Sequence, residues 1–113
     1  MEKQYYVYIL SNKVNTTLYV GVTSNLVRRI AEHKAGVASE FTFRYRCVKL
    51  VYFVAGSNVH EALNEEKKLK RWKREWKEAL IEKSNPRWKD LSSEVGVSDE
   101  LVQHIAANAD TYS

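Results

Sequence analysis

Arg29 and His33 have the residue types and the spacing that chemistry on a phosphate requires. They are one helical turn apart, and on a helix beginning near Leu26 both lie at one border of the apolar stripe. A border position half-shields a side chain while its tip can reach a ligand. Arg29 could hold a phosphate through paired hydrogen bonds, and His33 could hydrogen-bond or transfer a proton. The alternatives are a surface ion pair for Arg29 and ordinary packing for His33.

Glu66 is an acidic residue inside the apolar stripe of a second predicted helix, whereas its neighbour Glu65 lies at the outer edge of that stripe. An ionised carboxylate on a buried face costs several kcal/mol unless it is paired or bound to a cation. Lys70, one turn later, could pair with Glu66 within the helix. A metal ion facing an active site is the other explanation, and the pattern alone leaves both open.

Tyr6, Tyr8 and Tyr19 lie on a predicted pair of strands, with Tyr6 and Tyr8 on one face because they are two residues apart. A phenol facing Arg29 could orient water or accept a proton, if a cation lowers its pKa from the usual value of about 10. Ordinary strand packing is the alternative. Cys47 has no histidine at metal-ligand spacing, so we expect no zinc site.

These residues need a small set of elements to position them. Strands are predicted over 5–10, 18–22 and 47–55 from their β-branched and aromatic runs, and helices over 26–35, 59–83 and 99–107 from their apolar spacing. Ser24 or Asn25 would cap the first helix, Gly36 would end it, and Ser98 would cap the last one. Residues 37–46 are predicted to form a polar, basic loop. The long helix could be single or bent near Trp72, and it ends before Pro86.

The predicted order is β-β-α-β-α-(α)-α, which indicates a small α/β (α+β) fold. We expect a three-stranded, mostly antiparallel sheet flanked by helices, because helices must cover the apolar faces of the sheet. A chain of 113 residues is one domain's worth of sequence. We expect that domain to span residues 1–91, and residues 92–113 to form an acidic extension that is a short helix or a partly disordered tail.

Charge is distributed unevenly along the chain. The net charge is +4, but residues 28–89 carry sixteen Lys and Arg against eight Glu, and residues 90–113 carry five acids with no Lys or Arg. The basic central part suits a polyanion such as nucleic acid, although solvated lysine-rich helix faces would give the same count. The acidic tail could cover the basic face or extend from it.

The compartment is predicted from what the sequence lacks. One cysteine cannot form an internal disulfide, and the first residues show no signal-peptide pattern. No apolar run approaches the roughly 20 residues that span a bilayer. We therefore expect a cytoplasmic protein with no membrane partner, and a monomer as the default state.

The candidate residues occur in an order that resembles the GIY-YIG nuclease superfamily. Tyr6-Val-Tyr8 is followed by Tyr19-Val-Gly21, and then by Arg29, His33 and Glu66. The chain is most similar to the small single-domain bacterial members of the UPF0213 type, which are related to the N-terminal domain of the excinuclease C protein. The resemblance covers residues 4–91, and residues 18–33, 61–67 and 85–91 carry most of it.

The resemblance implies a role for each matched residue. Tyr8 and Tyr19 would position or activate the attacking water, Arg29 would bind phosphate, and His33 would assist proton transfer. Glu66 would be the only protein ligand of one Mg²⁺ or Mn²⁺ ion. Gly21 matches a structural position of the motif, and Asn85 loosely matches a late asparagine. One departure is Tyr6, which replaces the first glycine of the family name.

The implied function is metal-dependent hydrolysis of phosphodiester bonds in nucleic acid, with DNA expected rather than RNA and DNA repair or processing as the expected context. Contacts to the nucleic-acid backbone are expected from Lys34, Arg44, Arg46, Lys67, Lys70 and Arg74. One alternative is a non-cleaving nucleic-acid binder with the same fold. A more remote one is a protein or membrane-surface module using Trp72 and Trp76, but these share a stripe with Leu69 and Leu80, which favours core packing.

Overall fold

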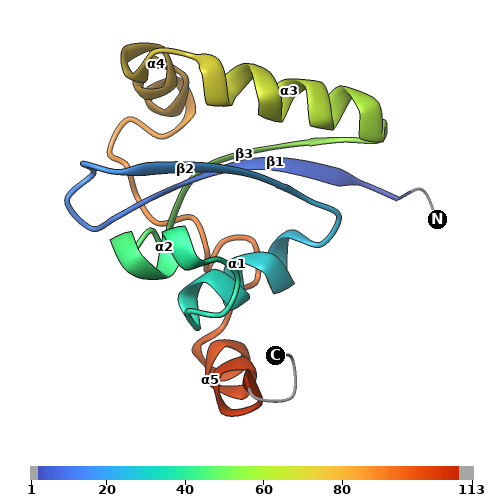
Figure 1. The fold of residues 1–113 in the computed structure, drawn as a ribbon, viewed down its shortest axis with the longest axis vertical. Coiled ribbons are helices and arrows are strands. Elements are labelled where there is room, and N and C mark those ends of the chain that lie inside the picture. Colours follow the sequence, from blue (N-terminus) through green and yellow to red (C-terminus); the bar gives the residue numbers. More distant parts are fainter. Residues whose placement is uncertain (1–2, 110–113) are drawn as a thin grey trace.

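The computed structural model describes residues 3–109, and the fold is α+β as predicted. Its elements, in chain order, are β1 (Tyr5–Ser11), β2 (Leu18–Thr23), α1 (Leu26–Lys34), α2 (Glu40–Tyr45), β3 (Lys49–Gly56), α3 (Val59–Arg71), α4 (Arg74–Ser84) and α5 (Asp99–Ala107). Figure 1 shows α3 and α4 on one face of the sheet, and α1, α2 and α5 on the other.

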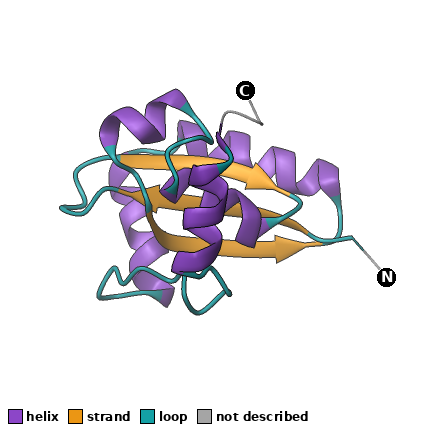
Figure 2. Ribbon diagram, turned by 90° about the horizontal axis from the view of Figure 1, so that it is seen from below, coloured by secondary structure: helices purple, strands orange, loops and turns teal. Residues whose placement is uncertain are grey.

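The sheet has three strands in the order β2-β1-β3, and both pairings are antiparallel. The central strand β1 pairs with β2 so that Tyr8 lies opposite Gly21 and Leu10 lies opposite Tyr19. A bulge interrupts its pairing with β3 between Ile9 and Leu10. Figure 2 shows the three strands side by side, with helices covering the sheet.

Helices cover both faces of β1, so nearly every side chain of this strand is buried. Tyr8 and Leu10 point to the face covered by α1, where they join one apolar cluster. Val7 and Ile9 point to the face covered by α3 and α4, where they join a second cluster with Leu69. This arrangement explains why β1 is a compact apolar run rather than an alternating one, since successive side chains alternate between two buried faces.

The predicted limits of α1 and α5 are confirmed by their caps. The Asn25 side chain accepts a hydrogen bond from the Arg28 N–H at the start of α1, and Gly36 follows the helix with a φ of 81°. That left-handed backbone is one that glycine adopts at low cost. The Ser98 side chain accepts from the Leu101 N–H and caps α5.

The prediction of a loop over residues 37–46 is wrong, because α2 lies within it. Ser39 caps this helix by accepting a hydrogen bond from the Thr42 N–H, and Arg46 ends it in the left-handed region with a φ of 57°. The helix has six residues, and only Thr42 among them is buried. Such a short helix with one buried residue produces no periodic apolar stripe for sequence analysis to detect.

The long predicted helix is two helices, and the bend falls at Trp72 as the sequence allowed. Trp72 and Lys73 have extended backbone between α3 and α4. Trp72 packs against the core cluster of that face. The expectation that Trp76 also packs in the core is wrong: it is 52% exposed, and its ring meets that of Trp72 at a centroid distance of 6.0 Å.

The segment after α4 returns to the α1 face and adds an outer layer. Asp90 accepts a hydrogen bond from the Leu50 N–H at 3.1 Å and forms an ion pair with Lys34 at 2.7 Å. Val97 and Ile105 join the core cluster of α1. The acidic extension is therefore helical over α5 and packed against α1, while its residues 110–113 lie outside the described part of the chain.

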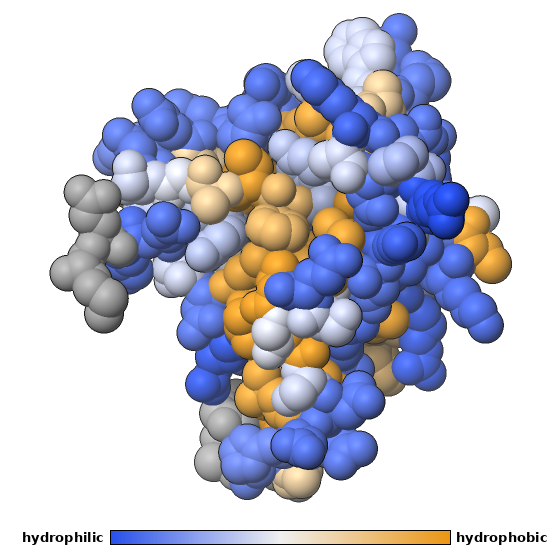
Figure 3. Space-filling view, turned by 180° about the vertical axis from the view of Figure 1, so that it is seen from behind, coloured by the Kyte–Doolittle hydropathy of each residue, from blue (hydrophilic) through white to orange (hydrophobic). Residues whose placement is uncertain are grey.

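The molecular surface reflects this layering. Seen from behind, it is mostly hydrophilic, with an apolar strip that runs from the level of the sheet towards α5 (Figure 3). Within residues 3–109, no helix has the length and apolar character needed to cross a membrane.

Candidate active site

The β1–β2 pair brings Tyr8 and Gly21 face to face, and the contact explains the glycine. A Cβ built on Gly21 would overlap the Cζ and hydroxyl oxygen of Tyr8. The Tyr8 ring therefore lies across the space that a side chain at position 21 would occupy. Gly21 allows the Tyr8 hydroxyl to reach beyond its own strand towards β2 and α1.

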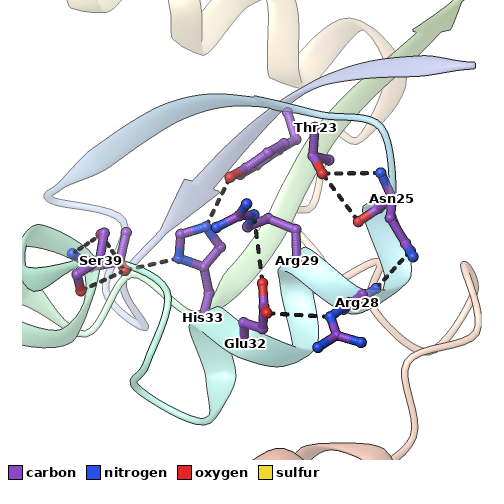
Figure 4. A network of polar contacts seen from close by, with 9 residues as sticks. Thr23, Asn25, Arg28, Arg29, Glu32, His33 and Ser39 are labelled. Carbon is purple, nitrogen blue, oxygen red and sulfur yellow. Dashed lines mark hydrogen bonds and ion pairs between the residues drawn. The ribbon is translucent and has the colours of Figure 1, made fainter. Parts of the chain in front are cut away.

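The Tyr8 hydroxyl meets His33 in a buried chain of hydrogen bonds. Its oxygen is 2.8 Å from His33 Nε2, and His33 Nδ1 is 2.9 Å from Thr42 Oγ1. Thr42 Oγ1 is in turn 2.8 Å from Ser39 Oγ (Figure 4). The Tyr19 ring flanks this chain, with its centroid 5.4 Å from the His33 ring and 6.4 Å from the Tyr8 ring.

Burial keeps His33 neutral. Burial, with a further contribution from the Arg29 charge, lowers the pKa of His33 to about 4. A neutral imidazole carries one N–H, and within residues 3–109 the Tyr8 hydroxyl has no other acceptor for its proton. The consistent arrangement has Tyr8 O–H donating to Nε2, and the Nδ1–H of His33 donating to Thr42.

The condition under which Tyr8 could accept a proton, a pKa lowered by a cation, is not met in the net balance. Burial raises the pKa of Tyr8 well above its ordinary value, and the nearby Tyr19 adds to the rise. The Arg29 charge does lower it, but Glu66 and Glu32 act against Arg29. The Tyr8 hydroxyl is consequently protonated at neutral pH and must pass on its own proton before it can take another.

Arg29 lies beside this chain with part of its side chain in solvent. The side chain is 43% exposed, and it extends towards the His33 ring in Figure 4. Its ion pair with Glu32 is long, at 3.6 Å between Nε and Oε1. Arg28 points away and meets the other oxygen of Glu32 at 3.4 Å. The border position predicted for Arg29 is what leaves its guanidinium able to reach a ligand.

Glu66 extends from α3, between the buried residues Ala62 and Leu69 of the same helix face. Its side chain is only 16% exposed, and Lys70 Nζ lies 3.2 Å from Oε1. The intrahelical ion pair that the sequence allowed is therefore present. A carboxylate oxygen is also the donor type that Mg²⁺ and Mn²⁺ prefer, and such an ion keeps most of its waters when a protein supplies one ligand. Glu66 thus fits a single divalent ion; that role stays a prediction.

Arg29 and Glu66 come from helices on opposite faces of the sheet, α1 and α3 (Figure 1). Their charges nevertheless act on one group, since Arg29 lowers the pKa of the Tyr8 hydroxyl and Glu66 raises it. Helix α3 packs on both β1 and the edge strand β2, so Glu66 extends from a helix that covers the strand carrying Tyr8. That Arg29 and Glu66 act together on one phosphate beside Tyr8 stays a prediction.

The six basic residues predicted to contact nucleic acid differ in the interactions that they make within the protein. Lys34 is paired with Asp90, and Arg74 donates to the backbone carbonyls of Thr16 and Asn15. These two side chains hold the fold together. The others are Lys70, paired with Glu66; Arg44 and Arg46, which lie over the rings of Tyr45 and Phe43; and Lys67, which extends from α3.

Asn85 is a buried residue at the end of α4. Its side-chain N–H groups donate to the carbonyls of Val51 and Lys89, and its oxygen accepts from the Lys89 N–H. Every polar atom of the amide is thus used to fasten the loop after α4 to β3. The structure gives Asn85 a structural role, and its loose match to a family asparagine stays untested.

Sequence reasoning missed three residues that border the site: Ser39, Thr42 and Phe41. All three lie in or beside α2, which was predicted to be a loop. The Phe41 ring contacts Tyr19 at a centroid distance of 5.9 Å, and Thr42 holds His33. The only available signal was the N-cap pattern of Ser39 followed by Glu40, which is weak by itself.

Comparison with known proteins points to the family that the sequence resembles. The GIY-YIG catalytic domain profile matches residues 4–79. A UPF0213 protein of Staphylococcus haemolyticus is 40% identical over 79 residues, which are 70% of this chain and 95% of that protein. A UPF0213 protein of Natronomonas pharaonis is 37% identical over 81 residues, which are 72% of this chain and 94% of that protein.

A solved structure has a similar fold. The solution NMR structure of a UPF0213 protein from Bacillus halodurans aligns with a TM-score of 0.51 at 27% identity, covering 84% of this chain and 99% of that one. The motif residues, the antiparallel sheet and these similarities agree. The chain belongs to the GIY-YIG catalytic domain family, a nuclease family, and is a small UPF0213-type member of it.

Proposed function

We propose that this protein is a divalent-metal-dependent nuclease that hydrolyses phosphodiester bonds, with DNA as the expected polymer. The observation that carries the proposal is the buried hydrogen bond between Tyr8 and a neutral His33, placed beside the half-exposed Arg29. A hydroxyl bonded to an uncharged imidazole can exchange protons, and a guanidinium beside it can hold the phosphate on which water acts.

The proton path follows from this geometry. An attacking water gives a proton to the Tyr8 oxygen, while the Tyr8 proton passes along its hydrogen bond to His33 Nε2. The Nδ1–H of the resulting imidazolium stays bonded to Thr42. Arg29 is one of the groups that lower the His33 pKa, so a phosphate bound to Arg29 would offset that charge and make His33 a better base.

Glu66 would hold the divalent ion near the same hydroxyl. When bound, a Mg²⁺ or Mn²⁺ ion supplies positive charge that stabilises the scissile phosphate and the leaving oxygen. Glu66 must leave Lys70 to bind the ion through the oxygen that Lys70 now contacts. This exchange is favoured because the Lys70 side chain is 53% exposed, and an ion pair between an exposed lysine and a glutamate of the same helix is weak.

A cleavage assay with matched neighbouring variants tests the proposal. Single-stranded, duplex, branched and flapped DNA, with RNA counterparts, are incubated with Mg²⁺, Mn²⁺ or EDTA. We expect cleavage with a metal ion, none with EDTA, and a loss of at least about 100-fold in Glu66→Gln and Arg29→Ala, the scale on which removing a charge-stabilising group acts.

Glu65→Gln and Arg28→Ala are the controls. Glu65 pairs with Lys68, and Arg28 faces away from His33, so each control removes a like charge one position away. We expect the controls to retain cleavage. Cleavage that survives both site substitutions would point to a contaminating nuclease. Metal-independent binding with no cleavage of any substrate would favour the non-cleaving binder.

A further inference from the structure

A cleft lies at the edge of the sheet next to the candidate active site. It has a volume of about 300 Å³ and is lined by Leu18, Tyr19, Val20, Phe41, Lys70 and Lys77. Tyr19 connects the cleft to the site, since its ring also packs against His33. The lining residues come from the edge strand β2, from α2 on one face of the sheet and from α3 and α4 on the other, so the cleft lies at this edge. Figure 1 shows α2 and α4 at the same end of the sheet, on opposite faces.

One wall of the cleft is aromatic. Phe41 projects from α2, with its ring 5.9 Å from that of Tyr19 and 4.7 Å from that of Tyr45. The Phe41 residue is 42% exposed, although it lies beside a tyrosine of the candidate site. A large ring with this much open surface, supported by two further rings, is a platform on which another flat ring can stack.

The opposite wall carries two ammonium groups. Lys70 pairs with Glu66, but Lys77 has no carboxylate partner among residues 3–109. A lysine that lines the cleft with no anion beside it leaves a charge for a ligand to neutralise. An apolar peptide side chain would suit Phe41 but leave the Lys77 ammonium without an anion, whereas a nucleotide offers a ring and a phosphate together.

We propose that this cleft is a subsite for an unpaired nucleobase, which stacks on Phe41 while its phosphate contacts Lys77. The subsite rests on the proposed nuclease function because it adjoins the same tyrosines, and it adds a preference for single-stranded or frayed nucleic acid. A base inside a duplex is already stacked on both sides and cannot present its face to Phe41. Stacking reads no particular base, so the subsite carries little sequence preference.

Binding in EDTA tests the subsite separately from cleavage. Fluorescence anisotropy measures the affinity of the full chain for labelled single-stranded DNA and RNA and for duplexes of equal length. We expect single strands to bind more tightly than duplexes. Phe41→Leu should weaken single-strand binding by about 5- to 100-fold, the effect of removing one stacking ring, and leave duplex binding unchanged. Lys77→Gln should weaken it and reduce its salt dependence.

Phe43→Leu is the matched control. Phe43 lies on the same helix and is 53% exposed, but its ring packs beside Gly36 and Arg46, away from the cleft. Phe41→Trp keeps a stacking ring and should restore binding, which separates stacking from a folding defect; thermal unfolding of each variant checks the fold. Equal effects of Phe41→Leu and Phe43→Leu, or equal affinity for single strands and duplexes, would overturn the subsite.

Failure of the two proposals can be told apart. If the protein cleaves duplexes and Phe41→Leu changes nothing, the nuclease stands and the subsite falls. If single strands bind through Phe41 and no substrate is cleaved with any metal, the subsite stands and the nuclease falls.

Discussion

At the scale of single residues, the candidate site depends on a few side chains, each of which is held in one position by contacts with its neighbours. Tyr8 lies across Gly21 and donates to His33, and His33 is held from its other nitrogen by Thr42. All of these contacts are buried, so each polar atom needs its partner. Adding a side chain at Gly21 creates an overlap, and removing a hydrogen-bonding group leaves its partner unsatisfied, so each residue can be tested by a single substitution.

Gly21→Ala should disturb both stability and the site. The added Cβ overlaps the Tyr8 ring, which must turn away from His33. We expect the free energy of unfolding to fall by about 1–3 kcal/mol, as for other overpacked sites, together with loss of cleavage. Urea unfolding measures the first effect. Gly56→Ala is the control because no atom lies within 4 Å of a Cβ at that position, and an equal loss in both variants would contradict the role given to Gly21.

Thr42→Val keeps the shape of the side chain but removes the oxygen that accepts from His33. The buried Nδ1–H then has no partner, which costs about 1–3 kcal/mol, and the ring is free to change tautomer. We expect nitrogen NMR of the imidazole to show a mixture of tautomers and the pH profile of cleavage to shift. Thr42→Ser keeps the hydroxyl and should preserve the wild-type profile; an unchanged NMR spectrum in Thr42→Val would argue against this positioning role.

At the scale of elements, the break between α3 and α4 decides what the basic residues do. Because the chain is extended at Trp72 and Lys73, α4 turns so that Arg74 donates to the carbonyls of the β1–β2 loop. Arg74 and Lys67 are equivalent in a count of basic residues, but the structure gives Arg74 hydrogen bonds to a loop of the same chain.

Arg74→Met and Lys67→Met should have opposite phenotypes. Arg74→Met loses hydrogen bonds from a charged donor to backbone carbonyls, so we expect the free energy of unfolding to fall by about 1 kcal/mol. Lys67→Met should leave unfolding unchanged, weaken nucleic-acid binding and reduce the salt slope by about 0.7–0.9 for each phosphate that the variant no longer neutralises. Thermal unfolding and a salt titration of binding measure the two effects, and the reverse pattern would show that the residues were assigned the wrong way round.

At the scale of the whole molecule, the segment after α4 completes the α1 side of the core. Val97 and Ile105 pack in the cluster that contains Leu26 and Ile30. Figure 1 shows α5 on the side of α1 that faces away from the sheet. Asp90 fastens this segment at its start. It accepts from the Leu50 N–H and pairs with Lys34, so a residue from the acidic part of the chain neutralises a lysine from the basic part.

The Asp90 connection makes stability depend on pH. Burial acts to raise the pKa of Asp90, but hydrogen bonds from Lys34 and Ser92, with the Lys34 charge, hold it below the ordinary value. A pKa depressed by folding stabilises the protein above the unfolded pKa of about 4, and this contribution is lost as the pH falls through the folded value.

Asp90→Asn should therefore be less stable than the wild type at neutral pH, and the difference should shrink below about pH 4. Thermal unfolding of both proteins from about pH 2 to about pH 7 gives the comparison, because that range spans the titration of the carboxyl group in both states. A difference that is constant across this range would assign the effect of the substitution to packing rather than to the carboxylate charge.

The order of residues along the chain was enough to predict the family and the sheet, and to single out candidate site residues in long periodic elements, whose roles stay predictions. Arg29 and Glu66 were found because each interrupts or borders an apolar stripe, a pattern that the local chain fixes. The caps of α1 and α5 could also be predicted, since an N-cap acts within one turn of its own helix.

Contacts between segments far apart in the chain became visible only in the folded protein. Three such contacts are the hydrogen bond from His33 to Thr42, the ring contact between Phe41 and Tyr19, and the hydrogen bond from Arg74 to the β1–β2 loop. Each joins two elements, and the sequence of neither element indicates the contact. The direction of the Tyr8 pKa shift has the same origin. It depends on burial and on charges from α1 and α3 together, and burial exists only once both faces of the sheet are covered.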